Sequence, residues 1–218
     1  MAASPTPPRC LESRGRAIGA ATLCIVRATV AAALAVGCCA SARAWVLTVN
    51  PGPKTIYLQV GNGTKNTADS AVNLVSVTVP AAQLGNGIGL AMTSDSTAAI
   101  SFYDNYAVCN PPQQVYVGGY LQAPNNSAAA AVLQVTTPSI LTSGADTLAF
   151  TAISWTSTAN GNSTADIPAG SFTGGTQLLR NIAPNNWVEN CLSFTYANAG
   201  VVAAGTYQGR ATYTLSAP

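Results

Sequence analysis

The C-terminal part of the chain has the clearest pattern of hydrophobic and polar positions. From Gly205 to Ala217 the even positions are polar, while the odd positions are small or apolar. This period of two is typical of a β-strand, whose successive side chains point to opposite faces of a sheet. We therefore predict a strand from Gly205 to Leu215 that has Arg210 on its outward face. Its inward face would carry Tyr207, Ala211, Tyr213 and Leu215.

Similar short runs, rich in β-branched and aromatic residues, recur along the rest of the chain. Segments rich in Gly, Pro and Asn separate them, and these segments stop strands because Gly and Asn tolerate positive φ and Pro lacks an N–H donor. One such segment, residues 142–146, has the composition of a tight turn. The predicted strands span residues 45–49, 55–60, 72–79, 88–93, 98–103, 114–121, 130–137, 147–156, 176–182 and 191–197.

The pattern contains no 3.6-residue apolar period long enough to predict a helix. A short helix stays open only at residues 127–135, where an alanine run precedes β-branched residues. Many short strands without helices predict an all-β fold. We expect an antiparallel β-sandwich of the Greek-key, immunoglobulin-like type, with a closed barrel as the second choice.

The first 44 residues have the pattern of an export signal. A basic region is followed by an uncharged run at residues 28–39, and Ala42 and Ala44 then stand at the −3 and −1 positions of a small-residue cleavage site. We predict a cleaved signal peptide at residues 1–44 and one β-sandwich domain at residues 45–218. Lipoprotein processing before Cys38 is the alternative.

Loss of this leader reverses the net charge. The whole chain carries +2, whereas residues 45–218 carry four basic residues against six acidic ones, which gives −2. A basic surface for nucleic acid is therefore not expected. The mature chain also has no second long apolar segment, so we predict no membrane span in it.

Cysteine and histidine content limits the chemistry. Only Cys109 and Cys191 remain after the leader, and an even pair in an exported chain predicts one disulfide, which we expect to tie a central strand to a late one. The chain has no histidine, which excludes Ser-His-Asp and Cys-His catalysis and leaves no zinc or iron–sulfur ligand set. The acidic residues are scattered and mostly adjoin turn residues. We expect no enzyme, no cofactor and no metal site.

Aromatic residues give one further candidate. Residues 102–106 hold three rings and two polar side chains, and ring faces beside polar groups suit sugars. The other interpretation is that alternate rings simply fill the core. A carbohydrate platform would use Tyr103, Tyr106, Trp155 and Trp187.

The end of the chain resembles that of bacterial pilins, and the overall composition resembles pilins and spore-coat-type surface subunits. In chaperone–usher pilins a glycine stands fourteen residues from the C-terminus, an alternating apolar strand follows, and the penultimate residue is tyrosine. Gly205 is the fourteenth residue from the end, and Tyr207, Ala211, Tyr213 and Leu215 alternate after it. The penultimate residue here is Ala217, and Cys109 and Cys191 lie farther apart than the pilin cysteines, which usually join two early strands.

This resemblance implies a non-enzymatic subunit at the periplasm, the cell surface or outside the cell. It would be a pilus- or fimbria-like subunit with a role in adhesion. It would assemble by β-strand addition with other subunits or with a periplasmic chaperone. The alternative is a monomeric secreted module that binds carbohydrate or a host surface. A periplasmic domain with neither role is the third choice.

Overall fold

The computed structural model describes residues 54–64, 72–124, 126, 128–159 and 164–218. Within these residues the fold is all-β: every strand pair is antiparallel, and the helices are two short 3-10 turns. The predicted all-β, antiparallel class is confirmed. Residues 1–44, the predicted signal peptide, and the predicted strand at 45–49 lie outside the described residues. Among the described residues, no helix has the length and apolar character needed to cross a membrane.

The largest sheet is built around two long central strands. Its order is β1-β5-β12-β9-β10, and β3 pairs with the C-terminal end of β12. The strands are β1 (Thr55–Val60), β3 (Leu90–Ala91), β5 (Val115–Gln122), β9 (Ile153–Ala159), β10 (Gly170–Ser171) and β12 (Trp187–Tyr196).

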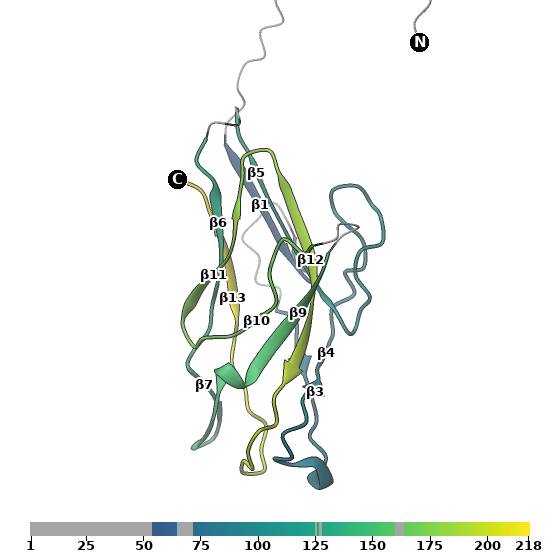
Figure 1. Cartoon of the computed structure of the whole chain (residues 1–218), viewed down its shortest axis with the longest axis vertical. Coiled ribbons are helices and arrows are strands. Elements are labelled where there is room, and N and C mark those ends of the chain that lie inside the picture. The colour runs from purple at the N-terminus through teal and green to yellow at the C-terminus, as the bar shows by residue number, and fades with distance from the viewer. Residues whose placement is uncertain (1–53, 65–71, 125, 127, 160–163) are drawn as a thin grey trace, which may run out of the picture. The chain divides into compact units, whose positions relative to one another are not determined.

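A three-stranded sheet forms a second layer, which Figure 1 shows beside the first. Its order is β11-β6-β13, with a register shift in β11 between Leu178 and Arg180. Two small hairpins complete the fold, β2 with β4 and β7 with β8. The bounds are β6 (Ala131–Thr136), β11 (Thr176–Ile182), β13 (Thr212–Ser216), β2 (Val75–Ser76), β4 (Thr93–Ser94), β7 (Ile140–Ser143) and β8 (Asp146–Ala149), with 3-10 turns η1 (Ala81–Gln83) and η2 (Phe150–Ala152).

Both sheets contribute alternate side chains to one hydrophobic core. The close approach of the layers is visible at Gly119, where an added Cβ would lie 2.8 Å from Cδ1 of Ile182. This glycine leaves the space that the isoleucine side chain fills. The core includes Val115, Val117, Leu121, Ala131, Leu133, Val135, Trp155, Phe172, Ile182, Val188, Leu192, Phe194 and Leu215.

Four of the predicted strands match the structure closely. Strands at 55–60 and 176–182 occur with those bounds, and β5 and β6 lie within one residue of their predictions. The helix considered at residues 127–135 is wrong, because residues 131–136 pair as a strand with both neighbours. The predicted strand at 147–156 is interrupted by η2, and only short pieces of 72–79 and 88–93 form strands.

The predicted strand at 98–103 is also wrong, since this segment forms a loop whose only described ladder contact is a single bridge between Ile100 and Ala107. The side-chain oxygen of Ser101 accepts hydrogen bonds from the backbone N–H groups of Tyr103 and Asp104. Such local bonds compete with a sheet ladder and favour a turn.

The C-terminal strand is shorter than predicted. It begins at Thr212, which pairs with Thr136 at the end of β6, and Pro138 follows shortly afterwards without an N–H donor. Before it, Gln208 forms only an isolated bridge with Thr142. The predicted alternation nevertheless holds for the side chains, because Arg210 is exposed and the four predicted inward residues are covered at least in part. Tyr207, Ala211 and Tyr213 are partly buried and Leu215 is buried, whereas Gly205 is exposed.

Candidate functional site

Aromatic side chains form a row across the outer face of the largest sheet. In register, Tyr57 of β1 lies opposite Tyr120 of β5, which lies opposite Trp187 of β12. Their strand neighbours Leu58, Leu121 and Val188 pack into the core, so the row faces away from it. The ring centroids are 6.0 Å apart for Tyr57 and Tyr120, and 5.5 Å apart for Tyr120 and Trp187.

A loop at residues 98–109 covers part of this outer face. Tyr116 and Cys191 belong to strands, but neither exposes any surface, and Ala98 and Val108 of the loop pack against them. The disulfide between Cys109 and Cys191 fastens the loop to β12, with Cα atoms 5.4 Å apart. The predicted disulfide is therefore present, but it joins a loop to a strand rather than two strands.

The tip of this loop, residues 101–106, has a compact hydrogen-bonded form. The N–H of Ser101 donates to the carbonyl oxygen of Tyr106 at 2.8 Å, and the Asp104 carboxylate accepts from the N–H of Tyr106 at 3.1 Å. Asn105 completes the reversal with a positive φ of 62°, which asparagine tolerates better than most residues. Three rings consequently stay exposed on a fixed loop: Phe102 at 45%, Tyr103 at 67% and Tyr106 at 72%.

Tyr103 extends the aromatic row. Its ring stacks on Trp187 with centroids 5.2 Å apart and an interplanar angle of 26°. One face of the Tyr103 ring is thus occupied by the indole, while most of the residue remains open to solvent. Tyr57, Tyr120, Trp187 and Tyr103 together are called the outer aromatic row below.

A buried carboxylate lies next to the row. Glu189 is only 5% exposed, and its Oε2 accepts hydrogen bonds from the Tyr116 hydroxyl at 2.8 Å and the Trp187 indole N–H at 3.1 Å. Gly118 permits this arrangement, because any Cβ there would collide with the Tyr116 hydroxyl. Burial and the neighbouring Glu189 both raise the pKa of Tyr116 well above its ordinary value. The network fixes the indole on which Tyr103 stacks.

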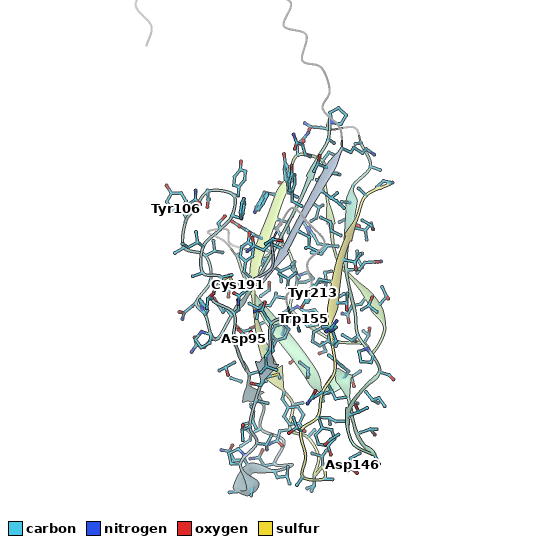
Figure 2. The ribbon with its side chains drawn as sticks, turned by 180° about the vertical axis from the view of Figure 1, so that it is seen from behind. Asp95, Tyr106, Asp146, Trp155, Cys191 and Tyr213 are labelled. Atoms are coloured by element: carbon cyan, nitrogen blue, oxygen red, sulfur yellow. A yellow bond between two sulfur atoms is a disulfide. The ribbon has the colours of Figure 1, made fainter. Side chains whose placement is uncertain are left out.

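The structure brings together only part of the predicted carbohydrate platform. Tyr103 and Trp187 are in contact, and Tyr106 lies at the outer end of the loop, as Figure 2 shows. Trp155 does not belong to the platform: it is 4% exposed, packs against Phe172 in the core, and donates its indole N–H to the Pro168 carbonyl oxygen. Its place follows from β9, where Ile153 and Trp155 share the inward face.

Sequence reasoning missed Tyr57, Tyr120 and Glu189. The alternation within each strand placed Tyr57 and Tyr120 on faces opposite to aliphatic residues, but only the strand register brings the two rings together. Glu189 lies before the predicted start of its strand at residue 191. It gave no signal as part of a hydrogen-bonded network.

The C-terminal strand forms a second candidate region, at one edge of the fold. β1 ends one side of the larger sheet and β13 ends one side of the smaller sheet, and these two strands approach each other. Lys54 precedes β1 and Pro218 follows β13, and the Lys54 ammonium donates a hydrogen bond to the carbonyl oxygen of Pro218 at 2.7 Å. We call this region the β1–β13 edge.

Acidic side chains in the described part of the chain lie apart from one another. The described residues contain no group of three His, Cys, Asp or Glu side chains arranged to hold a metal ion. Apart from Glu189, the Asp95 carboxylate accepts from the N–H of Leu74 in a loop, and Asp166 pairs with Arg180 at 3.5 Å.

Comparison of the chain with protein-family models, with curated proteins and with solved structures found no significant match.

Proposed function

We propose that the chain is an exported, non-enzymatic subunit of a surface structure. It would have a Greek-key, immunoglobulin-like β-sandwich fold and assemble by β-strand addition at the β1–β13 edge. One observation carries this proposal. Two sheets that share a core end, at neighbouring edges, in strands that each carry an incompletely buried inward side chain, Ile56 in β1 and Tyr213 in β13.

An edge strand offers unpaired N–H and C=O groups to another chain, and natural proteins usually protect such edges. The other edges of this fold are protected or short. β11 carries a register shift beside Arg180, and β10 has only two residues. β1 and β13 instead run in regular register along their inner partners. The β1–β13 edge therefore favours pairing with an added strand.

Partly exposed apolar side chains mark the same edge. Ile56 of β1 shares the inward phase of Leu58 and Val60, yet it is 40% exposed. Tyr213 and Ala217 pack only partly against the core. An added strand would cover these residues and gain the free energy of burying apolar surface. The alternating C-terminal strand that resembles pilins supports the same assignment.

The disulfide supports an oxidising destination such as the periplasm, the cell surface or the extracellular space. A neighbouring subunit or a periplasmic chaperone would supply the added strand. Adhesion is the role that such a surface assembly would serve.

Assembly can be tested with the full chain produced in an exporting host. We expect shed surface material to contain high-molecular-weight polymer. Ile56→Asp should give a folded monomer that does not polymerise, because the new charge stays hydrated in the monomer but becomes buried by an added strand. Leu178→Asp on β11, where Leu178 is 54% exposed, is the matched control and should assemble normally.

Size-exclusion chromatography and electron microscopy give the readout. A wild-type protein that remains a cooperative monomer would refute the subunit role. An Ile56→Asp protein that polymerises as well as wild type would place assembly at another surface.

A further inference from the structure

We propose that the loop tip at residues 101–106 is a saccharide-binding site. In this site the solvent-facing side of the Tyr103 ring stacks on the apolar face of a neutral pyranose. The site lies on the outer face of the larger sheet and uses no residue of the β1–β13 edge. It can therefore act in a monomer and in an assembled subunit.

The Tyr103 ring is held in place before any ligand arrives. Its back rests on Trp187, and the Trp187 indole is fixed by its hydrogen bond to Glu189 and by contact with Tyr120. The disulfide and the backbone bonds of Ser101 fix the loop itself. A ring that is already ordered loses little conformational entropy on binding, which favours affinity for a small ligand.

The groups around this ring suit a neutral sugar. Asp104 and Asn105 are exposed beside Tyr103 and supply carboxylate and amide groups for hydroxyls, and Tyr106 adds a second ring at the same tip. Residues 95–112 contain no Lys or Arg, so the loop has no cation for a phosphate, a nucleic acid or an acidic lipid. A ring face combined with polar edges is the usual composition of a sugar subsite.

A saccharide fits this loop better than a protein partner. A stable protein interface buries about 800 Å² on each side, which requires an extended surface. The exposed rings here belong to the six residues of one protruding loop tip, and Figure 2 shows Tyr106 at its outer end. A single ring with adjacent hydrogen-bonding groups is a surface of the size of one sugar residue.

The test uses the exported protein on an array of neutral hexose and N-acetylhexosamine oligosaccharides, with wild type, Tyr103→Phe and Tyr103→Ala compared. We expect binding by wild type and a similar affinity for Tyr103→Phe, which keeps the ring face. Tyr103→Ala should bind about tenfold more weakly, as expected for the loss of one ring contact. Val201→Ala, at a position 77% exposed elsewhere on the surface, is the control for a surface truncation.

A second readout separates stacking from a change in folding. In NMR spectra of the bound sugar, ring stacking should shift its C–H protons upfield with wild type and Tyr103→Phe but not with Tyr103→Ala. Tyr106→Ala removes an exposed ring and should weaken binding while the Tm stays unchanged. Wild type that binds no neutral saccharide, or Tyr103→Ala that binds as well as wild type, would overturn the proposal. If the loop amides are protected from hydrogen exchange in assembled material and no glycan binds, the loop would belong to a subunit contact, and the proposal would also be overturned.

Discussion

Aromatic rings gather in two regions of this protein, and the regions differ in what surrounds the rings. In the core, Phe172 lies 5.1 Å from Phe150, 5.0 Å from Trp155 and 6.1 Å from Phe194, centroid to centroid. All four of these residues are at least 92% buried, since none exposes more than 8% of its surface. These rings are held by packing between the two sheets.

The outer aromatic row has similar ring spacings but a polar environment. The Tyr57 hydroxyl donates to the side-chain oxygen of Gln122 at 3.3 Å, Trp187 donates to Glu189, and the row ends at the exposed Tyr103. The disulfide and these hydrogen bonds hold the outer region in place, whereas the core rings are held by packing against a second sheet. The comparison teaches that ring spacing alone does not identify a core. The covering layer and the polar partners decide whether a ring cluster stabilises the fold or stays open for binding.

Removing the disulfide should have the largest effect on the outer region, because the disulfide fastens the loop at residues 98–109 to the outer face of the sheet. The paired change Cys109→Ala with Cys191→Ala opens a connection with a sequence separation of 82. The chain-entropy estimate for a loop of this length is about 4–5 kcal/mol of unfolding free energy. Urea unfolding of the purified, oxidised protein measures the loss, and reduced wild type is the control. A loss below about 1 kcal/mol would contradict a stabilising tether.

Truncating one ring in each region tests the comparison directly. Phe172→Ala should lower the free energy of unfolding by about 3–5 kcal/mol, as for other large-to-small changes in a core. Tyr103→Ala removes an exposed ring with one stacking partner and should cost only about 0.5–1.5 kcal/mol. Thermal and urea unfolding of both variants give the values. Equal losses would mean that the two regions do not differ in the way described.

Substitutions of Glu189 test whether its hydrogen bond with Tyr116 stabilises the outer region. Glu189→Ala leaves the Tyr116 hydroxyl without this acceptor and should cost about 1–3 kcal/mol of unfolding free energy. Glu189→Gln keeps an acceptor oxygen of similar size and should cost less. Urea unfolding measures both variants. If the Gln variant is as unstable as the Ala variant, the acceptor bond does not stabilise the protein.

Because the pKa of Tyr116 is raised in the folded protein, we predict that the free energy of unfolding falls at alkaline pH. The folded protein keeps this hydroxyl protonated at a pH where the unfolded chain releases the proton, so the contribution is complete below about pH 10 and declines as the pH rises above it. Tyr116→Phe should reduce this alkaline decline without abolishing it, because burial also raises the pKa of Tyr213. The substitution also lowers stability near neutral pH by removing a hydrogen bond. Urea unfolding of both proteins from pH 8 to pH 11 provides the comparison. An unchanged alkaline slope would show that Tyr116 does not titrate in this way.

The sequence predicted the fold where one local pattern was decisive. Residues 55–60 and 176–182 form strands with the expected bounds, and Cys109 and Cys191 pair as expected for the only two cysteines in residues 45–218. The loop at 98–103 escaped prediction because its β-like composition conceals a turn held by the side chain of Ser101.

The candidate site was predicted less well, because its rings come from three strands and a loop. The prediction that Trp155 belongs to the platform was wrong, because its alternation with Ile153 in β9 places both side chains on the inward face. No local pattern could join Tyr57, Tyr120 and Trp187, since their contact depends on the register of β1, β5 and β12. The stacking of Tyr103 on Trp187 depends further on where the disulfide fastens the loop.

Hydrogen exchange of native surface assemblies, compared with dissociated monomer, tests the proposed strand addition most directly. We expect backbone amides of β1 and β13 to gain protection on assembly, because an added strand would pair along the outer side of one of these strands. Amides of β11 should exchange alike in both states and serve as the internal control. Protection that appears at β11, or β1 and β13 amides that exchange equally fast in both states, would contradict assembly at the β1–β13 edge.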